Sequence, residues 1–531
     1  MSKPVILSAI LLLCILQARS QFPQIKWWFD TYDASFGQSA AGDIDNDGML
    51  EITFGCYRHD SCVYALNAED GSLLWKYNTH PFGAEGCNDV APVIYDVDGD
   101  DSLEVIVPSS CNPKTFCFRG SNGAVQWQAP TAGSDSPPTV ADIDGDGKPE
   151  ILHGGFDGAV VCLNGENGSL AWKKTVWSNS WVQTAPTILD ADGDGSLDFI
   201  VGTWAFGNDT SKVYAFRASD QTLIWSVPVG DVIYHGTGVS DLDNDGQPEL
   251  AMGAYDGLLY IFNAGDGSLA WDYQGDYYIG APATVADLDN DGSCEVIFCD
   301  AFGVSALTSS GGLKWYYPIP GYGTAFRGAA VAEINGDGIP DVIFGTSTGE
   351  VTVLSGDDGS EIWSLDLQAH YGLPFEIDHA PVIADFDSDG TIDIFLVGGH
   401  AEYPAIENNY GRGYMISAGT GTGPSWTMFQ HDIRRRSSTC GTPATSVSEI
   451  PPSAGGVAYI YPNPATSLVS IQTAEPSEIR ISDMQGRTLV TIRSSGTITS
   501  ADISGLRPGF YLVQVSGSLY TSSARLVIPG R

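Results

Sequence analysis

A nine-residue acidic pattern recurs eight times in this chain, at intervals of 46 to 53 residues. In "DIDGDGKPE", residues 142–150, acids stand at positions one, three, five and nine. An EF-hand places its last acid at position twelve and continues as a helix, whereas here a short apolar run, "ILHGG", follows the ninth position. Because so many carboxylates repel one another, the pattern predicts a cation-binding turn between two strands.

The predicted metal ligands are the acids, or their replacements, at these four positions of each loop. They are Asp43, Asp45, Asp47 and Glu51; Asp96, Asp98, Asp100 and Glu104; Asp142, Asp144, Asp146 and Glu150; Asp190, Asp192, Asp194 and Asp198; Asp241, Asp243, Asp245 and Glu249; Asp287, Asp289, Asp291 and Glu295; Glu333, Asn335, Asp337 and Asp341; and Asp385, Asp387, Asp389 and Asp393. Two loops depart from the pattern. The second has Asp101 in place of the turn glycine, and the seventh has Glu333 and Asn335 at its first two ligand positions.

A second periodic pattern lies between the acidic loops. Three good copies, of the type "VYALNAEDGSLLW", end at Trp75, Trp172 and Trp271, and poorer copies end at Trp127, Trp225, Trp315, Trp363 and Trp426. Each period therefore predicts four short antiparallel strands, which is typical of one β-propeller blade. Since an isolated blade cannot bury both of its faces, we expect the tryptophans to pack between neighbouring blades.

These two patterns together resemble known propeller families over residues 25–430. The acidic loops resemble the FG-GAP repeats of the integrin alpha chain, and the "G-S-L-x-W" strands resemble those of quinoprotein dehydrogenases. The first resemblance implies structural calcium, up to eight ions. The second implies the scaffold only, because the chain has no adjacent Cys-Cys pair and no C-x-x-C-H motif.

The number of blades and the way in which the ring closes are separate predictions. Eight loops predict an all-β, eight-bladed propeller, and seven blades remain the alternative if the irregular last unit, 385–430, is an appendage. Trp27 and Trp28 precede the first loop as a blade-ending tryptophan precedes each later one. We therefore expect the N-terminal strand to complete the last blade, alongside "SWTMF" near Trp426.

The two ends of the chain predict export. Residues 1–20 have the basic start, apolar run and "ARS" end of a secretory signal peptide. The propeller is predicted at 21–440, followed by a Gly-, Pro-, Ser- and Thr-rich linker at 441–456 and a small immunoglobulin-like β-sandwich at 457–531.

This C-terminal module resembles the type IX secretion system C-terminal sorting domain, through "PNP" at 462–464, "GR" at 486–487 and "GFY" at 509–511. The resemblance implies the type IX secretion machinery as a partner and a secreted or outer-surface location. The alternative is an immunoglobulin-like adhesion module. No stretch of the sequence predicts a transmembrane segment.

Charge narrows the possible partners. Residues 21–456 contain 61 acids and 16 bases, whereas the tail contains four acids and six bases. Such an acidic surface excludes nucleic acid and anionic lipid as partners. Because 31 of the 61 acids stand at ligand positions, we expect calcium to stabilise the fold.

The cysteines fit an oxidising compartment. Cys56 and Cys62, and likewise Cys111 and Cys117, flank short loops between neighbouring strands, so we predict these two disulfides. Cys294 and Cys299 point to opposite faces of one strand and are not paired with each other. No partner is assigned to Cys87, Cys162 or Cys440.

The order of the strands predicts where a ligand would bind. The acidic loops and the "DG" turns emerge on one face of the propeller, and the non-repeating loops emerge on the opposite face, where a rigid scaffold usually carries its function. Those loops are aromatic and polar, which suits sugar rings or peptide side chains. The candidate ligand-binding residues are Trp177, Trp181, Trp204, Tyr234, His235, Tyr277, Tyr278, Tyr322, Arg327, Tyr371, His379 and Arg412. Arg327, His235 and His379 each stand six residues before an acidic loop, so they should begin equivalent strands.

Three functions fit these observations. The leading hypothesis is a non-catalytic, calcium-stabilised surface propeller that binds a glycan or an extracellular protein. The alternative is a polysaccharide lyase of the rhamnogalacturonan-lyase kind, whose chemistry needs cations and a base. Only Lys314 and Arg327 supply permanent cations between residues 218 and 411, and no catalytic motif stands outside the acidic loops. A purely structural element of an extracellular matrix is the third hypothesis.

Overall fold

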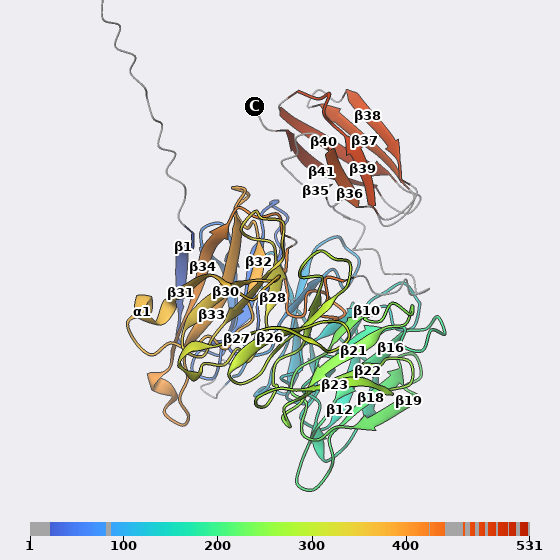
Figure 1. The fold of residues 1–531 in the computed structure, drawn as a ribbon, viewed down its shortest axis with the longest axis vertical. Coiled ribbons are helices and arrows are strands. Elements are labelled where there is room, and N and C mark those ends of the chain that lie inside the picture. Colours follow the sequence, from blue (N-terminus) through green and yellow to red (C-terminus); the bar gives the residue numbers. More distant parts are fainter. Residues whose placement is uncertain are drawn as a thin grey trace, which may run out of the picture.

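The computed structural model describes residues 22–80, 86–423 and 425–440, and then a series of segments between 460 and 528. The predicted signal peptide and the linker at 441–456 lie outside the described residues. Strands dominate the described chain (Figure 1). The helices described are one five-residue α-helix, α1 (Leu367–Tyr371), and two single-turn 3₁₀ helices, η1 (Pro320–Tyr322) and η2 (Ile406–Asn408). Among the described residues, therefore, no helix is long and apolar enough to cross a membrane.

Eight four-stranded antiparallel sheets follow one another between residues 24 and 419. Their strands are β2 (Ala40–Gly42), β3 (Glu51–Gly55), β4 (Cys62–Asn67) and β5 (Leu73–Asn78); β6 (Val93–Tyr95), β7 (Glu104–Pro108), β8 (Lys114–Arg119) and β9 (Val125–Pro130); β10 (Thr139–Ala141), β11 (Glu150–Gly154), β12 (Ala159–Asn164) and β13 (Leu170–Thr175); β15 (Thr187–Leu189), β16 (Asp198–Gly202), β18 (Lys212–Arg217) and β19 (Leu223–Pro228); β20 (Gly238–Ser240), β21 (Glu249–Gly253), β22 (Leu258–Asn263) and β23 (Leu269–Gln274); β24 (Thr284–Ala286), β25 (Glu295–Cys299), β26 (Gly303–Leu307) and β27 (Leu313–Pro318); β28 (Ala330–Ala332), β29 (Asp341–Gly345), β30 (Glu350–Ser355) and β31 (Glu361–Asp366); and β32 (Val382–Ala384), β33 (Ile392–His400), β34 (Tyr410–Gly419) and β1 (Gln24–Thr31). A two-stranded ribbon, β14 (Ser180–Trp181) and β17 (Trp204–Ala205), extends from the fourth sheet.

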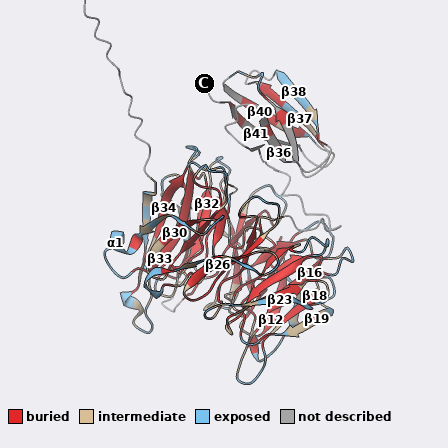
Figure 2. Cartoon of the chain, in the orientation of Figure 1, coloured by how far each residue is buried: buried red, intermediate tan, exposed pale blue. Residues whose placement is uncertain are grey.

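These sheets form the predicted β-propeller. Neighbouring sheets contact each other through their first strands, as β2 does with β6 and β20 does with β24, so the first strand of each sheet is the innermost. The first and second strands of each sheet are joined by an acidic loop. The inner strands of the sheets are buried on both faces, which explains the near-continuous apolar sequence of second strands such as "EVIVP" (Figure 2). The outermost strands alternate between exposed and at least partly buried residues.

The N-terminal strand closes the ring, as predicted. β1 pairs antiparallel with β34 and completes the sheet that contains the eighth acidic loop. Trp27 on β1 donates its indole N–H to the carbonyl of Ala68 in the first sheet, at 2.9 Å. Residues 385–419 are therefore an integral sheet rather than an appendage.

The blade-ending tryptophans pack between sheets, which confirms their predicted role. The indole N–H of Trp75 donates to Gly120 O of the next sheet at 2.6 Å, and Trp127 donates to Gly165 O at 2.8 Å. Trp225 and Trp315 make the equivalent bonds. At Gly123, with φ of 66°, an added Cβ would lie 2.6 Å from the ring of Trp75. The repeated "DG" and "NG" turns therefore allow these tryptophans to pack tightly.

Trp426 is an exception, and its prediction was wrong. It does not accompany β1 on the outer edge but pairs with Ile383 of the innermost strand β32. The rest of the segment 425–440 crosses the inner strands of successive sheets, bonding backbone groups of Ala41, Val140, Ile188, Val239 and Val285. We call residues 425–440 the axial segment, because the strands that it follows surround the propeller axis.

Both predicted disulfides are also wrong. Cys87 is bonded to Cys111, and Cys294 is bonded to Cys440 at the end of the axial segment. Cys56 and Cys62 lie opposite each other, with the Cys56 N–H donating to Cys62 O, but both thiols are free, as is that of Cys117. Sequence proximity was a poor guide because the actual partners come from different loops that only the fold brings together.

The C-terminal module has two sheets, one of β35 (Ile460–Tyr461), β36 (Leu468–Gln472) and β39 (Ile498–Asp502), the other of β38 (Thr488–Arg493), β37 (Glu478–Asp483), β40 (Gly509–Ser516) and β41 (Thr521–Ile528). Side chains from both sheets, including Ile471, Ile481 and Val513, form one buried core. The module is therefore a small β-sandwich. Of its motif residues, 462–464 and 486 lie outside the described residues, and "GFY" begins β40.

Candidate metal sites and aromatic face

Each acidic loop is shaped by its own carboxylates. In the first loop, Asp43 accepts hydrogen bonds from the backbone N–H groups of Asp47 and Gly48, at 3.1 and 3.0 Å. Asp45 accepts from the same Asp47 N–H, and Asp47 accepts from Met49. The third, fifth and sixth loops repeat these bonds. The acids are thus turned toward the interior of the loop.

The acid at position nine is buried at the start of the second strand. Glu51 is 1% exposed and accepts a hydrogen bond from the Ile44 N–H at 2.8 Å, and the first seven loops all contain this bond. Burial, followed by the charges of the neighbouring loop acids, raises the pKa of Glu51 to about 8. For the same reasons the pKa rises to about 8 at Glu104 and to about 7 at Glu150, Asp198, Glu249 and Asp341. A cation inside the loop would favour the ionised form of these groups at neutral pH.

The carboxylates converge closely enough to hold one. In the first loop, oxygens of Asp43, Asp45 and Glu51 lie within 4.8 Å of one another, and comparable groups occur in the second to fifth loops. Clustered oxygen donors in a flexible turn suit Ca²⁺, which takes six to eight oxygen ligands, better than Mg²⁺, which demands a strict octahedron.

In three acidic loops, a lysine or arginine side chain of the same sheet pairs with the loop carboxylates. Lys26 of β1 enters the eighth loop, with its Nζ 2.6 Å from Asp387 and 3.1 Å from Asp393. Lys314 of β27 pairs with Asp289 in the sixth loop, and Arg217 pairs with Asp192 and Asp194 in the fourth. Both lysines stand immediately before a blade-ending tryptophan, where the side chain faces the loop of its own sheet. The eight loops are therefore not equivalent as candidate metal sites.

The substitutions in the two loops that depart from the sequence pattern have different structural consequences. Asp101 takes the place of the turn glycine and adopts its left-handed conformation, with φ of 67°. In the seventh loop, Glu333 accepts bonds from the backbone N–H and the hydroxyl of Thr422, at 2.8 and 2.9 Å. Glu333 thus holds the chain that leads into the axial segment, and is less available as a metal ligand.

The face opposite the acidic loops carries a continuous row of aromatic rings. We call it the aromatic band, and its members are Phe156, Trp181, Trp204, Phe206, Tyr234, Tyr255, Tyr278, Tyr277, Phe302 and Tyr322. Adjacent ring centroids lie 4.9 to 6.1 Å apart, as from Trp204 to Tyr255 at 5.3 Å. The rings come alternately from loops within a sheet and loops between sheets, and none is fully buried.

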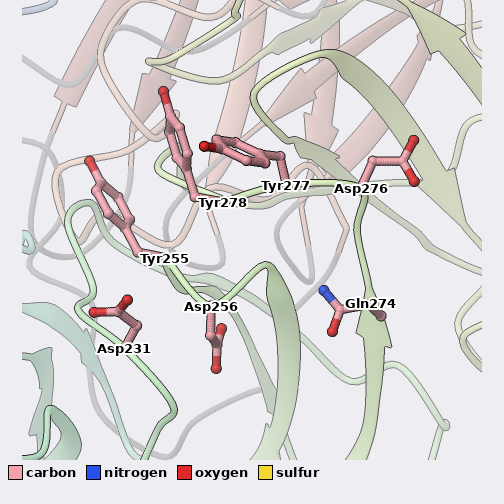
Figure 3. Close-up of a pocket in the computed structure, with 7 residues that line it drawn as sticks. All are labelled: Asp231, Tyr255, Asp256, Gln274, Asp276, Tyr277 and Tyr278. Atoms are coloured by element: carbon pink, nitrogen blue, oxygen red, sulfur yellow. The ribbon is translucent and has the colours of Figure 1, made fainter.

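A pocket of about 370 Å³ opens beside the middle of this band. Tyr255, Tyr277 and Tyr278 line one side of it, and Asp231, Asp256, Gln274 and Asp276 line the rest (Figure 3). Tyr278 lies between the other two tyrosines, with ring centroids 4.9 Å from Tyr255 and 5.1 Å from Tyr277. The pocket therefore combines ring faces with hydrogen-bond acceptors.

The other predicted ligand-binding residues lie in three places. Tyr371 and Arg412 form a separate cluster at the edge of the last sheet, where Arg412 lies over the Tyr371 ring and pairs with Asp30. His235, Arg327 and His379 are buried at the entry to the innermost strands. Trp177 is 44% exposed and bonds Asp209, and it is not in ring contact with the band.

Sequence reasoning missed several residues on this face. Phe156, Phe206, Tyr255 and Phe302 were overlooked, although each stands in the short loop between the second and third strands of a sheet. It also missed Asp89, Asp135 and Asp378, which stand seven residues before an acidic loop. His235, Arg327 and His379 stand six residues before an acidic loop, one position later than these acids. Comparison of the residues seven positions before each loop would therefore have identified all three acids.

Comparison with protein families identifies two parts of the chain. Residues 96–153, 142–201 and 307–396 match the FG-GAP-like repeat, and residues 459–529 match the secretion system C-terminal sorting domain. The chain thus contains FG-GAP-like repeats and a type IX sorting domain. The sorting domain indicates export to the cell surface or the extracellular space and implies contact with the type IX machinery. The search of curated proteins finds no match.

Solved structures show the same fold at low sequence identity. The biofilm matrix protein Bap1 of Vibrio cholerae has a TM-score of 0.56 at 14% identity, covering 81% of this chain and 97% of its own. Sqt1 of Saccharomyces cerevisiae has a TM-score of 0.53 at 11% identity, with 74% and 98% covered. Quinohemoprotein alcohol dehydrogenase of Comamonas testosteroni has a TM-score of 0.50 at 11% identity, with 76% and 77% covered. These likenesses establish the propeller fold alone.

Proposed function

We propose that this protein is a non-catalytic, calcium-stabilised propeller that binds a glycan along its aromatic band after export. The observation that carries the proposal is the band itself, ten partly exposed rings in unbroken contact across the loops of five sheets. None of these rings belongs to the buried hydrophobic cores of the sheets. A monomeric protein rarely exposes so much aromatic surface without a ligand.

The chemistry of the band favours a glycan over a protein partner. Ring faces pack against the C–H faces of sugars, and the flanking Asp231, Asp256 and Asp276 can accept hydrogen bonds from hydroxyl groups. Because the propeller is strongly acidic, polyanionic glycans would be repelled, so we expect a neutral or cationic polysaccharide.

Lyase chemistry is less well supported by the described residues. It needs cations beside the carboxylate of a uronic acid. Lys314 is held by the sixth acidic loop, on the opposite face, and Arg327 is buried among carboxylates. Either cation would have to leave the protein carboxylates beside it before it could bind the carboxylate of a uronic acid.

Affinity electrophoresis of the mature protein in gels that contain neutral plant or microbial polysaccharides tests the proposal. We expect retardation by at least one polysaccharide, and about a tenfold loss of affinity in Trp204→Ala, because Trp204 contacts three other rings of the band. Trp28→Ala is the matched control, since Trp28 is 50% exposed but lies on β1, outside the band. Equal loss in both variants, or no retardation by any polysaccharide, would contradict the proposal.

A further inference from the structure

A second polar site lies next to the aromatic band, where the loops between sheets enter the innermost strands. We define the central polar cluster as Asp89, Asp135, Gln183, His235, Arg327, Asp378 and His379. All seven stand six or seven residues before an acidic loop, so six of the connections, those that lead into the second to fifth, seventh and eighth loops, deliver them to equivalent places around the axis. The acidic loops, in contrast, lie at the other end of the strands.

Arg327 is at the centre of this cluster. It is 8% exposed, and its guanidinium lies 5.4 Å from the ring centroid of Tyr234. Burial lowers its pKa, but Tyr234, Asp378, Asp89 and Asp135 together raise it above the ordinary value, so Arg327 stays charged. Its NH1 donates to His235 Nε2 at 2.5 Å, while His235 Nδ1 donates to Gly280 O. His235 is therefore neutral, and its burial and Arg327 lower its pKa further.

Several atoms of the cluster have no hydrogen-bond partner among the described residues. They include acceptors, Asp135 Oδ1, Asp378 Oδ1 and Gln183 Oε1, and a donor, Arg327 Nε, together with His379 Nδ1 on a side chain that is 2% exposed. Arg327 Nε and Asp378 Oδ1 are 3.9 Å apart, too far for a direct hydrogen bond. One oxygen that both accepts and donates would fill this gap.

The mixture of donors and acceptors selects the chemistry of the ligand. A metal ion or an ammonium group cannot accept from Arg327, and an anion cannot donate to Asp135 or Asp378 and would be repelled by three carboxylates. A hydroxyl group does both. Neighbouring hydroxyls on one small ring would satisfy the donor and the acceptors together.

The cluster is also positioned to receive the end of a chain. Asp89, Asp135 and Asp378 are each partly exposed, although the unpaired oxygens of Asp135 and Asp378 have almost no accessible surface of their own, so a ligand would reach them only if neighbouring side chains shift. Beneath it, the axial segment closes the axis, with the ring centroid of Phe429 6.1 Å from that of His235. Tyr234 connects the cluster to the aromatic band, because its ring lies 5.6 Å from Trp204. A glycan could therefore leave the cluster along the band but could not continue through the axis.

We propose that the central polar cluster is the subsite for one terminal sugar residue, bound through its hydroxyl groups, while the aromatic band holds the units that follow. This inference rests on the proposed function and adds recognition of the chain end.

The test compares single sugars with polysaccharides on the mature, calcium-loaded protein. The probes are glucose, galactose, mannose, xylose and rhamnose at millimolar concentration, detected by ligand-observed NMR, together with the retarding polysaccharide in affinity gels. The variants are Asp378→Asn, which keeps the shape of the side chain, Trp181→Ala in the band, and Glu407→Gln, an exposed charge on η2, as the control.

We expect at least one monosaccharide to bind, Asp378→Asn to weaken its binding about tenfold, and Trp181→Ala to weaken only polysaccharide binding. Failure of every monosaccharide to bind would overturn the subsite. So would loss of monosaccharide binding in Trp181→Ala but not in Asp378→Asn, although polysaccharide binding would then still support the proposed function. If neither sugars nor polysaccharides bind, both proposals fail.

Discussion

The ammonium group of Lys26 lies 3.1 Å from the carboxylate of Asp393, which is completely buried at position nine of the eighth acidic loop. Residues 367 positions apart in the sequence thus meet where the N-terminal strand closes the propeller. Burial raises the pKa of Asp393 to about 7 although Lys26 opposes the rise. The lysine therefore occupies the place that a metal ion would take.

From this contact we predict that Lys26→Ala creates an additional calcium site. Removing the ammonium leaves four acids without a cation, so the variant should bind one more Ca²⁺ than the wild type in native mass spectrometry. In chelator it should melt at a lower temperature than the wild type. Lys173→Ala is the control, because Lys173 pairs with Asp157 on the exposed surface and should change neither quantity measurably. An unchanged calcium count would show that Lys26 does not compete with metal.

Chelation should destabilise the whole propeller. Without calcium, the acids of the first and fifth loops have no cation from the protein among the contacts that we describe, and their repulsion is uncompensated. Each site contributes about 2.7 kcal/mol when free calcium is a hundred times Kd, so several sites amount to a large loss. Calorimetry in excess chelator should show a much lower melting temperature, which calcium restores and magnesium restores poorly. If chelator leaves the melting curve unchanged, the acidic loops are not structural metal sites.

The chelated protein should become less stable as pH rises. The pKa values of Glu51 and Glu104 are raised to about 8, and those of Glu150, Asp198 and Glu249 to about 7. The folded state therefore binds more protons than the unfolded state above the ordinary pKa of these groups, and the free energy of unfolding falls with pH. We expect the melting temperature in chelator to fall between about pH 5 and about pH 8.

Excess calcium is the internal control for this pH dependence. Metal-bound carboxylates are already ionised, so the fall should disappear over the same range of pH. If the melting temperature in chelator instead rises toward pH 8, the position-nine carboxyl groups do not have raised pKa values in the folded protein.

Asp101→Gly should stabilise the second acidic loop. Asp101 has φ of 67°, whereas Gly48 and Gly246 occupy the equivalent position with φ of 91°. Glycine accepts the left-handed region without a steric penalty, so the substitution should raise the free energy of unfolding by about 1 kcal/mol. The reverse change in the first loop, Gly48→Asp, should lower it by a similar amount. Urea denaturation at fixed calcium measures both, and a destabilised Asp101→Gly would mean that the Asp101 carboxylate has a role of its own.

The repeated features could be predicted from the sequence because each repeat encodes its own local structure. The acidic loops, the four strands per unit and the packing of Trp75 and Trp127 all follow from patterns within about fifty residues. Closure by β1 could be predicted for the same reason, since Trp27 repeats the pattern.

Features that arise once in the chain could not be predicted in this way. The axial segment bonds the inner strands through its backbone, so its side chains leave no periodic signal. Cys294 and Cys440 are 146 residues apart, and nothing near either one indicates its partner. Asp89, Asp135 and Asp378 converge only when the ring closes, although their common offset from the acidic loops was present in the sequence.

Arg435 fixes the axial segment in place. Its side chain is completely buried, and it donates to three backbone carbonyls, those of Pro138 at 3.0 Å, Pro92 at 3.1 Å and Phe429 at 2.5 Å. Arg435→Met keeps much of the apolar volume but leaves all three carbonyls without this donor. Each buried acceptor left unsatisfied costs about 1–3 kcal/mol, so we expect a loss of about 3 kcal/mol or more.

Urea denaturation of the calcium-loaded protein measures this loss, with Arg119→Met as the control because Arg119 is exposed at the end of β8. Arg435 binds the second and third sheets to the axial segment, and the disulfide of Cys294 ties the end of that segment to the sixth acidic loop. Reducing this disulfide should therefore lower the free energy of unfolding more in Arg435→Met than in the wild type, because the variant also lacks the hydrogen bonds of Arg435. Equal stability of Arg435→Met and Arg119→Met would show that the axial segment contributes little to holding the sheets together.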